Sequence, residues 1–191
     1  MLVLRRSGNH SVLWMLEFDG DAVNNLVEEA VMAGIEPWRI VVTSLLPPHR
    51  EFLSKGVCDL FLDTPLFNAH TTAKDALWSG VPVLTVAGEG MASRVAASLT
   101  LMMDPAAVTI ARSLCDYREL AVKLASNASA LARLKQRVRA RRWTSPVFDT
   151  LGWMRRWERQ VRNLADLVAA GYFPPAHMHL VGDCTREQPT H

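Results

Sequence analysis

The chain has 191 residues, enough for one domain with a hydrophobic core. Hydrophobic residues make up 49% of it and charged residues 21%, a balance that argues against a largely disordered protein. The net charge of +2 does not point to nucleic-acid binding, and no apolar run approaches the roughly 20 residues that a membrane-spanning helix needs.

The three cysteines, Cys58, Cys115 and Cys184, are scattered along the chain and odd in number. This pattern fits a reducing compartment better than a disulfide-stabilised scaffold. The first residues form only a short apolar run before two arginines, which does not match a secretory signal. We therefore expect a cytoplasmic or nuclear protein that binds neither nucleic acid nor membrane.

Short apolar segments alternate with helical patterns in the first half of the chain. Strands are predicted over residues 11–18, 39–46, 59–64 and 81–86, and helices over 22–33, 47–56, 72–79 and 91–102. The predicted strands are continuously apolar, which is typical of a parallel sheet covered by helices on both faces. We therefore expect an α/β fold whose strand-to-helix turns meet at the carboxyl edge of the sheet, where such sheets bind ligands.

The pattern changes after residue 104, where helical segments follow one another without strands. We expect residues 9–104 to form the core and residues 105–171 to form a helical extension that packs on it. Residues 172–191 are rich in proline and polar residues and are predicted to form a flexible tail.

Two groups of polar residues in the second half have plain structural interpretations. A basic run is predicted to be a solvated helix face rather than a patch for nucleic acid or anionic lipid; it comprises Lys135, Arg137, Arg139, Arg141 and Arg142. Three possible metal ligands in the tail match no standard zinc spacing, so no metal site is predicted; they are His177, His179 and Cys184.

Arg94 lies in an early turn of the helix predicted over 91–102. The helix dipole disfavours a cation at that position. We therefore expect Arg94 to have a fixed carboxylate or phosphate partner, and Asp63 is a candidate.

Polar side chains gather where the helix predicted over 72–79 begins. His70, Thr71 and Thr72 stand at its start, and Asp75 follows one turn later. One interpretation is a capping box, in which Thr72 and Asp75 satisfy free backbone N–H groups. The other is a nucleotide site, because phosphate binds the unpaired N–H groups and positive dipole end of a helix, while a carboxylate suits the hydroxyls of ribose. The spacing alone leaves both interpretations open.

Residues 58–99, CDLFLDTPLFNAHTTAKDALWSGVPVLTVAGEGMASRVAASL, closely resemble the carboxyl-terminal lobe of the protein O-linked N-acetylglucosamine transferases, a family with SPINDLY-like members. The looser resemblance runs from about Asn9 to Gly171. It implies one Rossmann-like lobe of a two-lobe, B-type glycosyltransferase. Such an enzyme binds UDP-N-acetylglucosamine between its lobes and transfers the sugar to Ser or Thr hydroxyls of nuclear and cytoplasmic proteins.

The resemblance also assigns roles to individual residues. The His-Thr-Thr triplet that holds the diphosphate in the family corresponds to His70, Thr71 and Thr72, and the ribose-binding aspartate corresponds to Asp75. The loop that holds uracil is altered, because the family lysine is replaced by Pro48 and the family histidine by Glu51. Recognition of the base by the main chain at Leu46 is expected to survive these changes, because main-chain groups do not depend on the side chain.

The resemblance assigns no catalytic residue to this chain. In the family, the proposed catalytic groups and the sugar pocket belong to an amino-terminal lobe that has no counterpart in these 191 residues. No cofactor is expected besides the donor substrate, and acceptor proteins are expected to be bound through other regions. Two alternatives remain open: a lobe that uses GDP-fucose for protein O-fucosylation, and a truncated, non-catalytic nucleotide-binding module.

Overall fold

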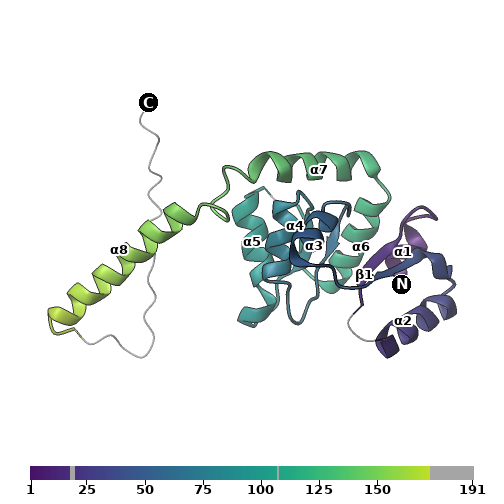
Figure 1. Cartoon of the computed structure of the whole chain (residues 1–191), viewed down its shortest axis with the longest axis horizontal. Helices are drawn as coiled ribbons and strands as arrows, with labels where there is room; N and C mark the ends of the chain where they lie inside the picture. The colour runs from purple at the N-terminus through teal and green to yellow at the C-terminus, as the bar shows by residue number, and fades with distance from the viewer. Residues whose placement is uncertain (18–19, 107, 173–191) are drawn as a thin grey trace. The chain divides into compact units, whose positions relative to one another are not determined.

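A computed structural model of the chain describes residues 1–17, 20–106 and 108–172. The chain divides into two compact units, Met1–Phe148 and Asp149–His191. Helices and strands alternate through most of the first unit (Figure 1). Within the described ranges, no helix is both long enough and apolar enough to cross a membrane.

The elements of the first unit lie close to the predicted ranges. Its strands are β1 (Leu13–Leu16), β2 (Ile40–Thr43), β3 (Phe61–Leu62), β4 (Val83–Val86) and β5 (Ile110–Ala111). Its α-helices are α1 (Leu2–Arg6), α2 (Gly20–Met32), α3 (Pro48–Lys55), α4 (Thr71–Trp78), α5 (Val95–Met103), α6 (Leu114–Ala125) and α7 (Ala128–Arg141). Two short 3-10 helices, Pro37–Arg39 and Met91–Ser93, precede β2 and α5.

The described strands pair in parallel, which confirms the predicted α/β fold with a parallel sheet. They form two groups: β1 pairs with β2, and β3, β4 and β5 lie side by side in that order. The register places Leu13 opposite Ile40 in the first group and Phe61 opposite Val83 in the second. The division into two groups and the two-residue strand β5 were not predicted from the sequence.

The larger hydrophobic core lies between α4, β4, α5 and α7. Helix α4 packs closely because it buries the small side chains of Ala73 and Ala76 beside Leu77, against Val83 of β4. Met103 of α5 and Val138 of α7 complete this core. A smaller core joins β1 and β2 to α1 and α2; its buried members are Leu4, Ala30, Ile35 and Ile40.

Arg39 fixes the segment that precedes β1. Its side chain is almost fully buried, and its guanidinium donates to the carbonyl oxygens of Ser11 (2.8 Å), Leu4 (2.7 Å) and Gly8 (2.7 Å). A buried charge is tolerated only when its donors are satisfied. Arg39 therefore ties α1 and the following loop to the start of β2.

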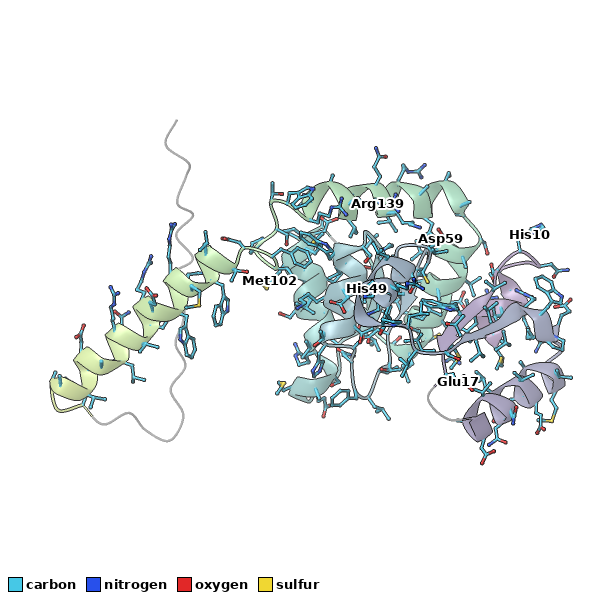
Figure 2. All side chains as sticks on the ribbon, viewed as in Figure 1. His10, Glu17, His49, Asp59, Met102 and Arg139 are labelled. Atoms are coloured by element: carbon cyan, nitrogen blue, oxygen red, sulfur yellow. The ribbon has the colours of Figure 1, made fainter. Side chains whose placement is uncertain are left out.

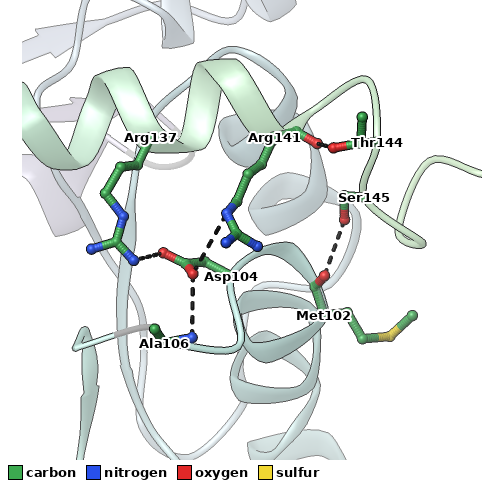
Figure 3. A network of polar contacts seen from close by, with 7 residues as sticks. All are labelled: Met102, Asp104, Ala106, Arg137, Arg141, Thr144 and Ser145. Carbon is green, nitrogen blue, oxygen red and sulfur yellow. Dashed lines mark hydrogen bonds and ion pairs between the residues drawn. The ribbon is translucent and has the colours of Figure 1, made fainter. Parts of the chain in front are cut away.

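The basic run of α7 is exposed at Arg137, Arg139 and Arg141, as predicted for a solvated helix face, and several of its side chains also pair with the rest of the first unit. Arg137 and Arg141 both form ion pairs with Asp104, which is buried at the end of α5 (Figure 3). Lys135 donates to Asp59 (2.9 Å) and to the carbonyl oxygen of Cys58 (2.7 Å).

Further contacts attach α6 and the residues after α7 to the core. The Tyr117 hydroxyl donates to the carbonyl oxygen of Asp63 (2.9 Å), and the Arg142 guanidinium lies over the rings of Trp78 (5.8 Å) and Trp143 (5.1 Å). Helices α6 and α7 thus belong to the same compact unit as the strands. The predicted boundary at residue 104 stays a prediction.

The second unit contains α8 (Thr150–Ala169), which begins at Asp149, whose carboxylate accepts from the Gly152 N–H (2.9 Å). None of its residues is buried, and Trp153 and Trp157 stack with their ring centres 5.8 Å apart. Of the tail predicted over residues 172–191, the part from residue 173 onward, with His177, His179 and Cys184, lies outside the described residues.

Candidate functional site

The candidate site lies where the loop after β3 enters α4 and where α3 packs beside α4. Both helices begin after loops that follow the carboxyl ends of strands, which is the edge where parallel sheets bind ligands. Figure 2 shows His49 on α3 in the middle of the first unit. The contacts between α3 and α4 bring together residues from the two loops that the sequence singled out.

The loop between β3 and α4 is held by buried polar residues. Asp63, which is 3% exposed, accepts hydrogen bonds from the Ala69 N–H (2.7 Å) and the Thr85 hydroxyl (2.6 Å). Burial raises the pKa of the Asp63 carboxyl, and these hydrogen bonds and the nearby charge of His70 act in the opposite direction. Asp63 therefore joins the loop, at Ala69, to β4, at Thr85, directly before His70.

Asn68 holds the same loop through a second set of hydrogen bonds. Its side chain is buried and donates to the carbonyl oxygen of Thr64 (2.9 Å), and its amide oxygen accepts from the Ala96 N–H (3.3 Å) at the start of α5. Its own N–H donates to the carbonyl oxygen of Ala92 (2.9 Å). These hydrogen bonds join the loop that leads into α4 to the loop that leads into α5.

His70 is the residue at which α4 begins, and its side chain makes no cap to the helix. Its ring stacks on Phe67, with ring centres 4.9 Å apart, and Nε2 lies 3.3 Å from the carbonyl oxygen of Ala92. Thr71 and Thr72 follow in the first turn and are exposed. The first turn of α4 therefore presents two hydroxyls and uncapped N–H groups, an arrangement that suits an anion.

The capping-box interpretation of Thr72 and Asp75 is wrong. The helix begins at Thr71, two residues earlier than that motif requires, so Thr72 lies inside the first turn. Asp75 pairs instead with Lys55, whose Nζ lies 3.2 Å from Oδ2 of Asp75. The carboxylate is partly exposed, with 26% of its side-chain surface accessible, so it can receive a ligand.

Lys55 is the site residue that the sequence analysis missed. It is the last residue of α3 and is 7% exposed, and its Nζ also lies 3.2 Å from Oε1 of Glu51. The spacing of Glu51 and Lys55, one turn apart on a helix, was the available signal. The second contact, to Asp75 of α4, depends on how the two helices pack and left no signal in the sequence.

The residues predicted to lie near the base are placed at the start of α3. Leu46 lies in the loop after β2 with 38% of its surface exposed, and Pro48 is the first residue of α3. Glu51 lies one turn further on and is partly buried. Glu51 and Asp75 both contact the ammonium group of Lys55, which links the predicted base and ribose positions. The side chain of Pro48 lies outside the described part.

Arg94 does not pair with Asp63, so that expectation is wrong. Its guanidinium donates to the carbonyl oxygen of Gly88 (2.7 Å), and both carboxylate oxygens of Asp63 are used within the core. Arg94 therefore closes the loop that carries Ala92, the partner of His70. The Gly88 N–H donates to the carbonyl oxygen of Ser93 (2.9 Å), so the two ends of this loop lie together and bring the Gly88 carbonyl to Arg94.

Among the described residues, no group of three His, Cys, Asp or Glu side chains is arranged to hold a metal ion. An open hollow of about 640 Å³ lies beside β5 and α6 rather than at the predicted residues. Its lining residues are Val108, Ile110, Arg112, Ser113, Asp116 and Leu120. The residues predicted from the sequence lie instead at the first turn of α4, where exposed hydroxyls, a free helix end and the Asp75 carboxylate occur together.

Comparison with known proteins identifies relatives over most of the chain. Residues 1–156 match the model of the family described as Glycosyl transferase family 41. An Arabidopsis thaliana protein named as probable UDP-N-acetylglucosamine–peptide N-acetylglucosaminyltransferase SEC is 36% identical over 189 residues, 99% of this chain and 18% of the relative. A Caenorhabditis elegans protein named as UDP-N-acetylglucosamine–peptide N-acetylglucosaminyltransferase is 34% identical over 139 residues, 73% of this chain and 12% of the relative.

The fold also matches a solved structure. A Thermobaculum terrenum O-GlcNAc transferase mutant superposes with a TM-score of 0.74 and 24% identity, over 84% of this chain and 32% of that one. At this identity the match supports the fold rather than the activity. The chain thus spans less than a fifth of the length of the two curated relatives and about a third of the solved chain.

Proposed function

The chain belongs to glycosyl transferase family 41, as the resemblance in residues 58–99 predicted, and we propose that it forms the donor-binding part of a UDP-N-acetylglucosamine–peptide N-acetylglucosaminyltransferase. The relatives carry that activity in their names. The observation that carries the proposal is the first turn of α4, which presents Thr71 and Thr72 beside His70 and leads to Asp75.

In this proposal, the diphosphate of the donor lies at the amino end of α4. The hydroxyls of Thr71 and Thr72, the ring of His70 and the free N–H groups of the helix donate to its oxygens. Asp75 accepts from the ribose hydroxyls, and uracil lies against the main chain at Leu46 and the start of α3 at Pro48 and Glu51. The donor is the only small molecule that the site requires.

The same arrangement explains what this part contributes to sugar transfer. When the bond between the sugar and the diphosphate breaks, negative charge grows on the departing UDP. Fixed N–H groups and the positive end of a helix dipole stabilise that charge, which lowers the barrier without any proton transfer from this chain. The acceptor in this proposal is a Ser or Thr hydroxyl of a cytoplasmic or nuclear protein.

Titration of UDP onto the chain tests the proposed site. We expect the unaltered chain to bind UDP and the variants Thr72→Ala and Asp75→Ala to bind it more weakly, by roughly tenfold each, because each loses a hydrogen bond that involves a charged group. Isothermal titration calorimetry at constant salt measures the affinities. Matched variants of exposed residues outside the site, Thr144→Ala and Asp166→Ala, are expected to leave the affinity unchanged.

Absence of binding to the unaltered chain, or equal affinity for all five proteins, would contradict the proposed site. Competition with GDP separates the donor classes. A guanosine nucleotide that displaces UDP at equal concentration would contradict the uridine assignment and support the GDP-fucose alternative.

A further inference from the structure

Lys55 is the one lysine in the described core whose ammonium lies between two carboxylates of the candidate site. Its Nζ is 3.2 Å from Oε1 of Glu51 and 3.2 Å from Oδ2 of Asp75, and only 9% of its side-chain surface is exposed. Glu51 belongs to α3 and Asp75 to α4. The ammonium therefore joins the two helices at the position where the proposed base and ribose contacts meet.

A buried ammonium is costly unless it is paired, and here two carboxylates pair with it. Lys55 is also the last residue of α3, where the negative end of the helix dipole favours a cation. The lysine is therefore stable in its position before any ligand binds. In turn, it gives the Oδ2 atom of Asp75 a fixed partner and so restricts the rotation of that side chain.

We propose that Lys55 is a positioning residue for the ribose-binding carboxylate. By holding Oδ2 of Asp75, it leaves Oδ1 to accept from the hydroxyls of a nucleoside diphosphate. This inference rests on the proposed function, and it adds a residue that neither the sequence motif nor the family resemblance indicated. It also supplies a positive charge beside a loop in which Pro48 stands where the family has a lysine.

The charge arrangement predicts what happens when the lysine is removed. Glu51 and Asp75 approach the same nitrogen, so their carboxylates lie close to each other. Without the ammonium between them, like charges repel, and Asp75 loses the orientation that faces a ligand. The loss falls on the hydroxyl that Asp75 contacts and not on the diphosphate at the start of α4.

The test compares UDP with 2′-deoxy-UDP, because the ratio of their affinities isolates the ribose contact. We expect the unaltered chain to prefer UDP by about tenfold, as one hydrogen bond to a charged group implies. In Lys55→Met, which keeps the length of the side chain and removes its charge, we expect the preference to fall below about threefold. Lys55→Arg keeps a cation and is expected to retain part of the preference for UDP. Lys123→Met, which changes an exposed lysine of α6, is expected to leave the preference unchanged.

The ratio also separates positioning from stability. A merely structural lysine would weaken both nucleotides equally, so an unchanged ratio in Lys55→Met, with far-ultraviolet circular dichroism that shows a folded chain, overturns the inference. If the ratio falls in Asp75→Ala and not in Lys55→Met, the proposed function stands and the inference fails. If the unaltered chain binds neither nucleotide, the proposed function fails and the inference fails with it.

Discussion

Asp63 illustrates how a single buried carboxylate can shape a site without touching a ligand. It follows β3 at the start of the loop that leads to His70, and its two carboxylate oxygens accept hydrogen bonds from the Ala69 N–H and the Thr85 hydroxyl. Its own carbonyl oxygen accepts from the Tyr117 hydroxyl, and burial strongly raises the pKa of that phenol. The loop geometry therefore depends on polar contacts that are partly or fully buried.

The titration of Asp63 is expected to appear in the stability of the chain. Burial raises its pKa above the ordinary value of 3.8, so the folded state binds the proton more tightly than the unfolded state does. The stabilisation from this group is complete below the unfolded-state pKa and is lost as the pH rises through the folded-state pKa. Relative to Asp63→Asn, which does not titrate, the free energy of unfolding of the unaltered chain should therefore fall as the pH rises from 4 to 7.

Urea denaturation of both proteins at a series of pH values measures this difference. Asp166→Asn, an exposed aspartate of α8, serves as the control and should follow the unaltered chain. A difference between the unaltered chain and Asp63→Asn that stays constant with pH, or that changes in the opposite sense, would contradict the prediction.

At the scale of residues, the sequence indicated the groups that stand next to each other in the chain. Asp75 lies one turn after His70, Thr71 and Thr72 at the start of α4, so their common position followed from spacing alone. Lys55 was missed because its contact with Asp75 joins residues 20 positions apart on two different helices. The pairing of Arg94 with Asp63 was wrong for a related reason, since sequence spacing does not show which backbone carbonyl lies nearer.

At the scale of elements, α7 is attached to the core by ion pairs as well as by its buried apolar residues Leu131 and Val138. Asp104, at the end of α5, receives Arg137 and Arg141 from successive turns of α7, and its carboxylate also accepts from the Ala106 N–H (3.2 Å). The carboxylate is 7% exposed, while each arginine is almost half exposed. The two ion pairs of Asp104 are therefore partly buried, because the carboxylate is buried and the arginines are reached by solvent.

Removal of this carboxylate is expected to loosen α7. Asp104→Ala should lower the free energy of unfolding by about 1–2 kcal/mol, a value reduced from that of a buried pair because solvent reaches both arginines. Chemical denaturation measures the loss, and Arg133→Ala, an exposed arginine on α7, is the matched control with an expected change within about 0.5 kcal/mol. A loss no larger than that of the control would mean that apolar packing at Leu131 and Val138 alone holds the helix.

The sequence predicted most elements because each has a pattern of its own. Strands β1, β2 and β4 are continuous apolar runs, and α4 begins at a cluster of polar residues. Strand β5 was missed because its two residues are too few for a pattern to show. The basic run of α7 was predicted to be solvated, and its arginines are exposed; their pairing with Asp104 had no signal in the sequence, because it depends on where the end of α5 lies.

At the scale of the whole molecule, the parallel arrangement followed from the continuous hydrophobicity of the strands. Their division into two groups did not, because pairing between strands is a long-range property that a local pattern does not carry. The family could be identified because residues 58–99 combine site and core residues in one stretch. The residues that contact the acceptor could not be predicted, since the chain spans 18% of its Arabidopsis thaliana relative.

The two strand groups differ in how deeply they are buried. Three of the four residues of β4 are buried, whereas all four residues of β1 are only partly buried. The first group depends on the smaller core and on the three carbonyl contacts of Arg39. Local opening costs least where the fewest apolar contacts are lost.

Hydrogen exchange is therefore expected to divide the first unit into two cooperative regions. Amides of β1 and β2 should exchange sooner than those of β4, and Arg39→Met should speed exchange in the first region while leaving the second nearly unchanged. Exchange followed by mass spectrometry of peptides measures both rates, and equal protection of the two regions would contradict the division. The loop at Leu46 and the start of α4 belong to different regions, so nucleotide that contacts both would couple their opening and slow exchange in β2 as well as in α4.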